Sequence, residues 1–211
     1  MAEHLKCVGD QATPPSAVFS KKTYTIAGIL TTVYGLEELP LQASNVACVW
    51  LLHPRLACQE RMSLIAAAIL RGWNGRSRDE RASSGQTKGV IAVSFDQRNH
   101  GTRLIDSLAN RTWGEGNPRH AQDMFSIIQG TARDTSLLID YIPSYIFPTS
   151  ERKISEHIVL GISLGAHAAW SCIFHEPRIS AAVIMLGCPD YINLMADRAR
   201  SSKLPSWVTC Y

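Results

Sequence analysis

One serine in this sequence has neighbours that suit nucleophilic chemistry. Residues 161–165 read Gly-Ile-Ser-Leu-Gly, so Ser163 lies two residues from Gly161 and two from Gly165. This G-x-S-x-G spacing is typical of a sharp strand-to-helix turn that exposes the serine hydroxyl, and glycine provides the small size that such a turn needs. The following helix would bring backbone N–H groups next to an attacked carbonyl. The pattern can also arise by chance, and a helix-capping serine after a parallel strand is the simpler alternative.

The rest of the chain alternates between segments with strand and helix character. Two continuous apolar runs, 47–52 and 90–95, are typical of strands buried on both faces. Asn117 and Pro118 predict an N-cap and first residue for a long helix that ends before Pro143. Strands are predicted at 23–26, 29–34, 47–52, 90–95, 157–162 and 181–186, and helices at 62–73, 118–142, 164–176 and 191–200. This order predicts an α/β fold, with a mostly parallel, right-handed sheet flanked by helices and an N-terminal antiparallel hairpin.

Length and composition fit one globular domain. The chain has 211 residues, of which 45% are hydrophobic and 18% charged. We expect a flexible lead-in at 1–20 and a single domain at 21–211. The net charge is +3 and the basic residues are scattered, so no nucleic-acid partner is expected. The sequence shows neither the apolar core of a signal peptide nor an apolar run of about 18 residues, which predicts no membrane span and a cytoplasmic location.

The six cysteines show no spacing typical of a metal site, and we expect neither a metal nor another cofactor. Cys48 and Cys172 lie within apolar segments and are predicted to be buried thiols. This cysteine usage fits a reducing compartment.

Three motifs occur in a fitting order: His53-Pro54 after the first buried strand, Asp96-x-Arg98-x-His100-Gly101 after the second, and Gly161-x-Ser163-x-Gly165. Together they resemble the α/β-hydrolase superfamily, nearest to its esterase and prolyl-oligopeptidase-like branches, over about residues 22–190. The resemblance implies that Ser163 is a nucleophile that attacks an ester, thioester or amide carbonyl of a small-molecule acyl substrate.

The resemblance also implies an oxyanion hole made by the N–H of Leu164 and an N–H in the loop after the first buried strand. Pro54 has no N–H, so Arg55 is the best candidate in that loop and Leu56 the next. The Arg55 side chain could meet an acidic substrate group, although a solvated surface arginine is the commoner situation.

Several polar residues near these motifs are expected to have structural roles. Asp96, Arg98 and His100 are interpreted as loop architecture, with an Asp–Arg pair and a backbone-bonded histidine that brace the turn. His53 is expected to help shape the oxyanion loop, His167 to pack beneath the Ser163 turn, and His120 to be a polar residue at the start of a helix.

The family's triad order is Ser, then Asp or Glu, then His, and this chain departs from it. Asp190 follows the last predicted strand and is a weak candidate for the acid, with a helix N-cap as the commoner role for such a residue. No histidine follows His175, so no triad base is visible. We therefore expect an α/β-hydrolase domain whose C-terminal strands are missing, which leaves an open sheet edge where a partner chain or second copy could bind. The alternatives to an esterase are a non-catalytic binding module and a serine peptidase.

Overall fold

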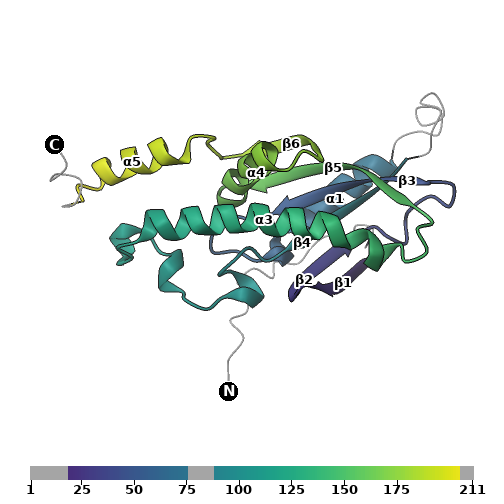
Figure 1. Cartoon of the computed structure of the whole chain (residues 1–211), viewed down its shortest axis with the longest axis horizontal. Coiled ribbons are helices and arrows are strands. Elements are labelled where there is room, and N and C mark those ends of the chain that lie inside the picture. The colour runs from purple at the N-terminus through teal and green to yellow at the C-terminus, as the bar shows by residue number, and fades with distance from the viewer. Residues whose placement is uncertain (1–18, 76–87, 205–211) are drawn as a thin grey trace, which may run out of the picture.

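The central strand of the sheet, β3 (Asn45–Leu52), is apolar along most of its length because both of its faces are covered. The computed structural model describes residues 19–75 and 88–204, and these contain a six-stranded sheet in the order β1-β2-β4-β3-β5-β6 (Figure 1). Strands β3 to β6 are parallel, whereas β2 is antiparallel to both β1 and β4. The other strands are β1 (Lys21–Ile26), β2 (Ile29–Tyr34), β4 (Lys88–Phe95), β5 (Lys153–Ile162) and β6 (Ile179–Met185).

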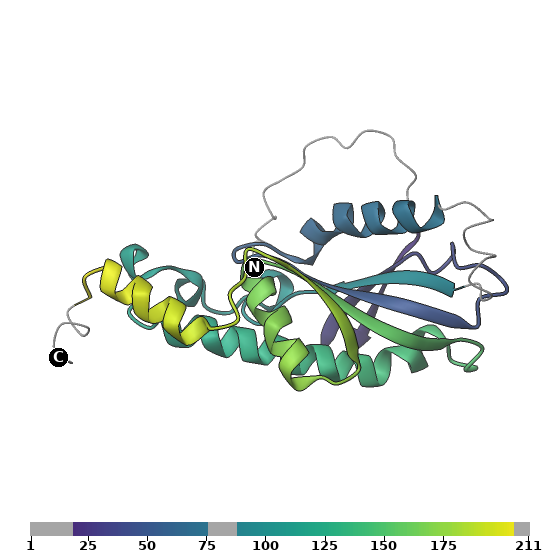
Figure 2. The ribbon, with the colours of Figure 1, turned by 90° about the horizontal axis from the view of Figure 1, so that it is seen from above.

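Helices cover the two faces of this sheet unequally. Helix α1 packs on one face, and α3 and α4 pack on the other (Figure 2). The helices are α1 (Ser63–Asn74), α3 (His120–Ile146), α4 (Leu164–His175) and α5 (Tyr191–Ser201). Helix α5 lies beyond the carboxyl ends of the parallel strands, where its Tyr191 ring stacks on Phe125 of α3 with centroids 6.2 Å apart.

The alternation of side chains along β3 divides the core in two. Val46, Cys48, Trp50 and Leu52 point into the larger core under α3 and α4, and the intervening residues point into the smaller core under α1. Successive residues of a strand face opposite sides, so a strand between two helical layers must be apolar at every position. The parallel α/β architecture predicted from the sequence is confirmed.

The long helix α3 departs from its predicted limits at both ends. Arg119 is its N-cap, while Asn117 precedes the helix and accepts a hydrogen bond from the Arg119 N–H at 2.9 Å. At the other end α3 continues through Pro143 to Ile146, although proline cannot donate the usual helix hydrogen bond. Ile142 and Ile146 are buried in the larger core, so the apolar stripe extends past Pro143 and its packing outweighs the lost bond.

Within the described residues, the sheet ends at β6, whose outer side is open. Val183 and Met185 are each 47% exposed, and Leu186, just after the strand, is 84% exposed. Binding of a partner chain or second copy at this edge stays a prediction.

Three described cysteines, Cys48, Cys172 and Cys188, are free thiols, and the first two are buried as predicted. Cys58 is disulfide-bonded, which does not fit the expectation of a reducing compartment. No described helix is long and apolar enough to cross a membrane. Most of the expected lead-in, residues 1–18, lies outside the described residues.

Candidate active site

Ser163 lies in the turn between β5 and α4 with an unusual backbone conformation. Its φ is +53° and its ψ is −110°, a region that costs a non-glycine residue about 1–3 kcal/mol. Hydrogen bonds fix the turn: the Ser163 N–H donates to Met185 O at 2.8 Å, and the Ser163 carbonyl accepts from His167 N at 3.1 Å. The Ser163 side chain makes no capping hydrogen bond to α4. Ser163 therefore does not cap the helix through its side chain, which was the simpler alternative.

The two glycines of the motif are required by contacts with neighbouring backbone. A Cβ atom on Gly161 would lie 2.1 Å from Gly165 O, and one on Gly165 would lie 2.1 Å from Leu52 O. Real Cβ atoms do not approach backbone this closely, and backbone cannot swing aside as a flexible side chain can. The spacing in the sequence thus reflects a close approach between the turn, α4 and the end of β3.

We expect Gly165→Ala to lower the free energy of unfolding by about 1–3 kcal/mol, because its methyl group would push the turn away from Leu52 and His53. Gly72 on the exposed side of α1 is a matched control, since a Cβ there meets nothing within 4 Å. Gly72→Ala is expected to be neutral or to stabilise by up to about 1 kcal/mol. Urea unfolding of both variants measures the difference, and equal effects would contradict the role given to Gly165.

Ser163 lines a cavity of about 680 Å³ at the carboxyl end of the sheet. Its walls come from the loop after β3, the segment before α3, the starts of α3 and α4, and α5. Two of the lining side chains are histidines and two are arginines. These four are His120, His167, Arg55 and Arg198.

His167 lies one turn after Ser163 on α4 and is held by the backbone of Cys188. Its Nδ1 lies 3.0 Å from Cys188 O and 3.2 Å from Cys188 N, and its ring meets the edge of Tyr191 with centroids 4.9 Å apart. Burial lowers the pKa of His167, and the Cys188 backbone partly opposes this. His167 packs beside the turn that carries Ser163, as expected from the sequence.

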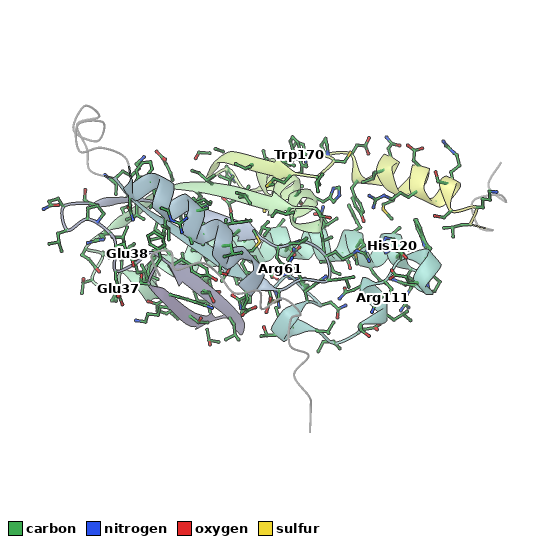
Figure 3. All side chains as sticks on the ribbon, turned by 180° about the vertical axis from the view of Figure 1, so that it is seen from behind. Glu37, Glu38, Arg61, Arg111, His120 and Trp170 are labelled. Carbon is green, nitrogen blue, oxygen red and sulfur yellow. The ribbon has the colours of Figure 1, made fainter. Side chains whose placement is uncertain are left out.

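His120, the first residue of α3, faces the same cavity and keeps a free ring nitrogen. The side chain is buried, its Nδ1 has no hydrogen-bond partner in the described structure, and its ring packs edge-on against Trp113 at 5.2 Å. Burial lowers the pKa of His120 first, and nearby Arg55 and Arg198 lower it further against a hydrogen bond with the Arg111 backbone. Figure 3 shows His120 and Arg111 at the end of the molecule occupied by the start of α3.

The loop after β4 is built around Asp96, which is 1% exposed. Its Oδ1 accepts a hydrogen bond from Gln59 N at 2.8 Å, and its Oδ2 accepts from both the N–H and the hydroxyl of Thr102 at 2.8 Å. A Cβ on Gly101 would collide with this carboxylate. Asp96 therefore joins the loops after β3 and β4.

The arginine of this loop has a different partner from the one expected. Arg98 donates to both oxygens of Asp134 on α3, at 3.1 and 2.9 Å, and Arg103 donates to the same carboxylate at 2.8 Å. The predicted Asp–Arg brace thus links the loop to α3 through Asp134, because the Asp96 carboxylate is already occupied by backbone and hydroxyl donors. His100 is bonded to backbone as expected, with Nδ1 3.0 Å from Arg98 O.

His53 connects the same two loops as a neutral ring. Its Nε2 accepts from Gln97 N–H at 3.0 Å, which leaves the proton on Nδ1 to bond Pro54 O at 2.8 Å. Complete burial lowers the pKa of His53 to about 4, and this outweighs the Pro54 carbonyl and the Asp96 charge, which both raise it. The side chain therefore shapes the loop that contains Arg55.

Acid should destabilise the protein through His53. Between about pH 6.5 and pH 4 the unfolded chain binds a proton at this histidine and the folded chain does not, so the free energy of unfolding falls as the pH falls. The contribution of this one residue is up to about 3 kcal/mol, and it is fully present above about pH 6.5. Urea unfolding at several pH values should show a shallower decline for His53→Gln than for the parent; equal slopes would contradict the assignment.

The residues of the candidate oxyanion donors line the same cavity as Ser163, and the candidate acid does not. Leu164 opens α4, and Arg55 lies on the cavity wall with its Nη1 donating to Asn110 O at 2.5 Å. Asp190 caps α5 by accepting from Asn193 N at 3.0 Å, and it lines a second, smaller cavity. The described residues thus place Ser163, Leu164 and Arg55 together, whereas Asp190 performs the capping role.

Sequence reasoning did not assign His120 or Arg198 to this site. The start of α3 and the end of α5 reach the cavity only through tertiary packing. His120 lies on the apolar side of its helix, and a polar residue at such a position is a sequence signal for a site. The sequence around Arg198 contains no comparable signal.

No family model matches the sequence, and no curated protein matches it. The Thermus thermophilus protein TT1662 has a similar structure, with a TM-score of 0.54 and 18% identity over 81% of this chain. The present chain spans 58% of that protein. An esterase from an Arctic intertidal metagenomic library (16% identity, TM-score 0.47, 85% of this chain and 65% of that one) and a carboxyl esterase of Bacillus coagulans (14%, 0.46, 89% and 52%) are more distant.

The order of the strands is the feature that identifies the architecture. A parallel sheet preceded by an antiparallel hairpin, with crossovers that place β4 before β3, is combined here with a strand–turn–helix at β5. The structural similarity extends over four-fifths of the chain. We conclude that the chain has the α/β-hydrolase fold.

Proposed function

We propose that this protein is a serine hydrolase of the esterase type, in which Ser163 attacks the acyl carbonyl of a small-molecule carboxylic ester. The observation that carries the proposal is the strained turn at Ser163, with φ of +53° and a side chain that does not cap α4. Strained backbone persists where the surrounding structure enforces it, and such sites are often functional. Here the glycine contacts enforce the turn, and the turn places the serine on a cavity wall.

Two backbone N–H groups support the role of this cavity in acyl chemistry. Leu164 is the first residue of α4, so its N–H has no partner within the helix. Arg55 follows Pro54 in a turn closed by the Ala57 N–H, which donates to Pro54 O at 3.3 Å. Donors at these two positions would stabilise the negative oxygen that forms when the Ser163 oxygen bonds to the carbonyl carbon.

The serine must lose its proton as it attacks, and a neutral histidine is the usual acceptor. Burial lowers the pKa of both cavity histidines, but His167 is engaged by Cys188 through Nδ1, whereas His120 keeps an unpaired Nδ1. No hydrogen bond joins either ring to the Ser163 hydroxyl in the described structure. This observation favours one alternative function, a non-catalytic module that binds a ligand in the same cavity.

Hydrolysis of a small substrate panel tests the proposal. The parent protein should release p-nitrophenol from p-nitrophenyl acetate and butyrate faster than buffer does, and should leave a peptide p-nitroanilide intact. Cleavage of the anilide at a comparable rate would identify a peptidase instead. If neither class is cleaved while the protein still binds the corresponding carboxylic acids, the enzyme proposal fails and the binding module is correct.

A further inference from the structure

Three charged side chains, Arg55, Asp197 and Arg198, line the cavity that contains Ser163. The carboxylate of Asp197 is paired with Arg200, at 3.2 Å between Oδ1 and Nη1. In the part of the chain that the structure describes, neither Arg55 nor Arg198 forms an ion pair. The cavity therefore has two arginines that form no described ion pair, and one carboxylate that is already paired.

Arg55 is anchored at the cavity wall by a hydrogen bond. Its Nη1 donates to the carbonyl of Asn110, a residue that is 3% exposed. Asn110 is itself fixed by two hydrogen bonds with Asn99: its Nδ2 donates to Asn99 O at 2.7 Å and its Oδ1 accepts from Asn99 Nδ2 at 3.0 Å. A guanidinium has five N–H donors, so this arrangement orients the group and leaves donors for a ligand. The Arg55 guanidinium, bonded to the protein backbone, therefore differs from that of an arginine surrounded by solvent.

Arg198 reaches the same cavity from α5. Its Nη1 lies 4.0 Å from Met195 Sδ, and a thioether is a weak acceptor. The charges of Arg55 and Arg198 affect two other residues of the cavity. Burial lowers the pKa of His120, and both arginines lower it further. Burial raises the pKa of Tyr191 to about 12, and both arginines oppose this rise. Both side chains line the same cavity, Arg55 from the loop after β3 and Arg198 from the exposed side of α5.

We propose that the cavity takes acyl substrates that carry a carboxylate, which Arg55 and Arg198 bind while the acyl carbonyl meets Ser163. This substrate class rests on the proposed esterase function of the same site. Charge-assisted hydrogen bonds to arginine are stronger than neutral ones and fit the planar carboxylate well. Met124, Trp113 and Leu194 on the remaining walls provide apolar surface for the chain between the two groups.

Equilibrium binding of an unreactive pair of ligands tests this in the Ser163→Ala background. Hexanoate and hexanamide have the same length and differ in charge, and isothermal titration calorimetry gives the affinity of each. We expect hexanoate to bind at least about tenfold more tightly than hexanamide. Arg198→Gln and Arg55→Gln should each remove most of this preference, and Arg198→Lys should restore part of it.

Arg71→Gln is the matched control, because it removes the same charge from an exposed helical residue, on α1, that does not line the cavity. It should keep the preference for hexanoate. Equal affinities for the two ligands, or a loss in Arg71→Gln as large as in Arg198→Gln, would overturn the proposal. Because no reaction occurs in this assay, a failure here is distinct from a failure of the parent protein to hydrolyse esters.

Discussion

Replacing Ser163 by alanine is expected to reduce the hydrolysis of p-nitrophenyl acetate at least about a hundredfold, to the rate seen in buffer. The change removes one oxygen atom at a half-buried site and leaves both glycine contacts and the backbone hydrogen bonds of the turn in place. Alanine also tolerates the positive φ no worse than serine does. The fold and the cavity should therefore persist while the attacking atom is lost.

Ser171→Ala is the matched control for this experiment. Ser171 lies on α4, is buried, and its hydroxyl has no hydrogen-bond partner in the described structure. Its removal should leave the rate within twofold of the parent, as an approximate bound. If Ser163→Ala retains the parental rate while its unfolding curve is unchanged, the hydrolysis arises elsewhere and the role of Ser163 is wrong.

Replacing Asp96 by alanine is expected to lower the free energy of unfolding by about 3–5 kcal/mol. The carboxylate accepts hydrogen bonds from Gln59 N and from both donors of Thr102, and it is 1% exposed. Its removal leaves buried or partly buried donors without partners, each at a cost of about 1–3 kcal/mol. It also removes the hydrogen bond from Gln59 N, one of the links between the segment after β3 and the loop after β4.

Asp106→Ala in the exposed part of the next loop provides the comparison. The Asp106 carboxylate accepts a hydrogen bond from Leu108 N at 2.9 Å and is exposed to solvent. Its loss should cost less than about 1 kcal/mol. Thermal or urea unfolding of the two variants measures the difference. A cost for Asp96→Ala no larger than that for Asp106→Ala would contradict the structural role given to Asp96.

The sheet could be predicted from sequence because its signals are local. A strand buried on both faces must be apolar at successive positions, so β3 and β4 are visible as continuous runs. The turn at Ser163 is visible because its glycines stand at fixed distances from the serine. Each of these features depends on a few residues that are close in the sequence, so the types and spacing of those residues predict it.

The walls of the cavity could not be predicted in the same way. His120 and Arg198 lie far apart in the sequence, on α3 and α5, and they line one cavity only because α5 packs beside the first turns of α3. The partner of Arg98 is a similar case. Asp134 is 36 residues away in the sequence, and it reaches Arg98 only because α3 packs against the loop after β4. Pro143 is a case in which a strong local signal was misleading. Proline predicts a helix end, but the helix continues because Ile142 and Ile146 are buried in the core.

The most direct test of the central claim is the site of covalent labelling by a fluorophosphonate. This reagent phosphonylates activated serines, and mass spectrometry of a proteolytic digest locates the adduct. We expect one adduct, on the peptide that contains Ser163, and no adduct in Ser163→Ala. An unlabelled parent, or an adduct on any other serine, would contradict the assignment of Ser163 as the nucleophile.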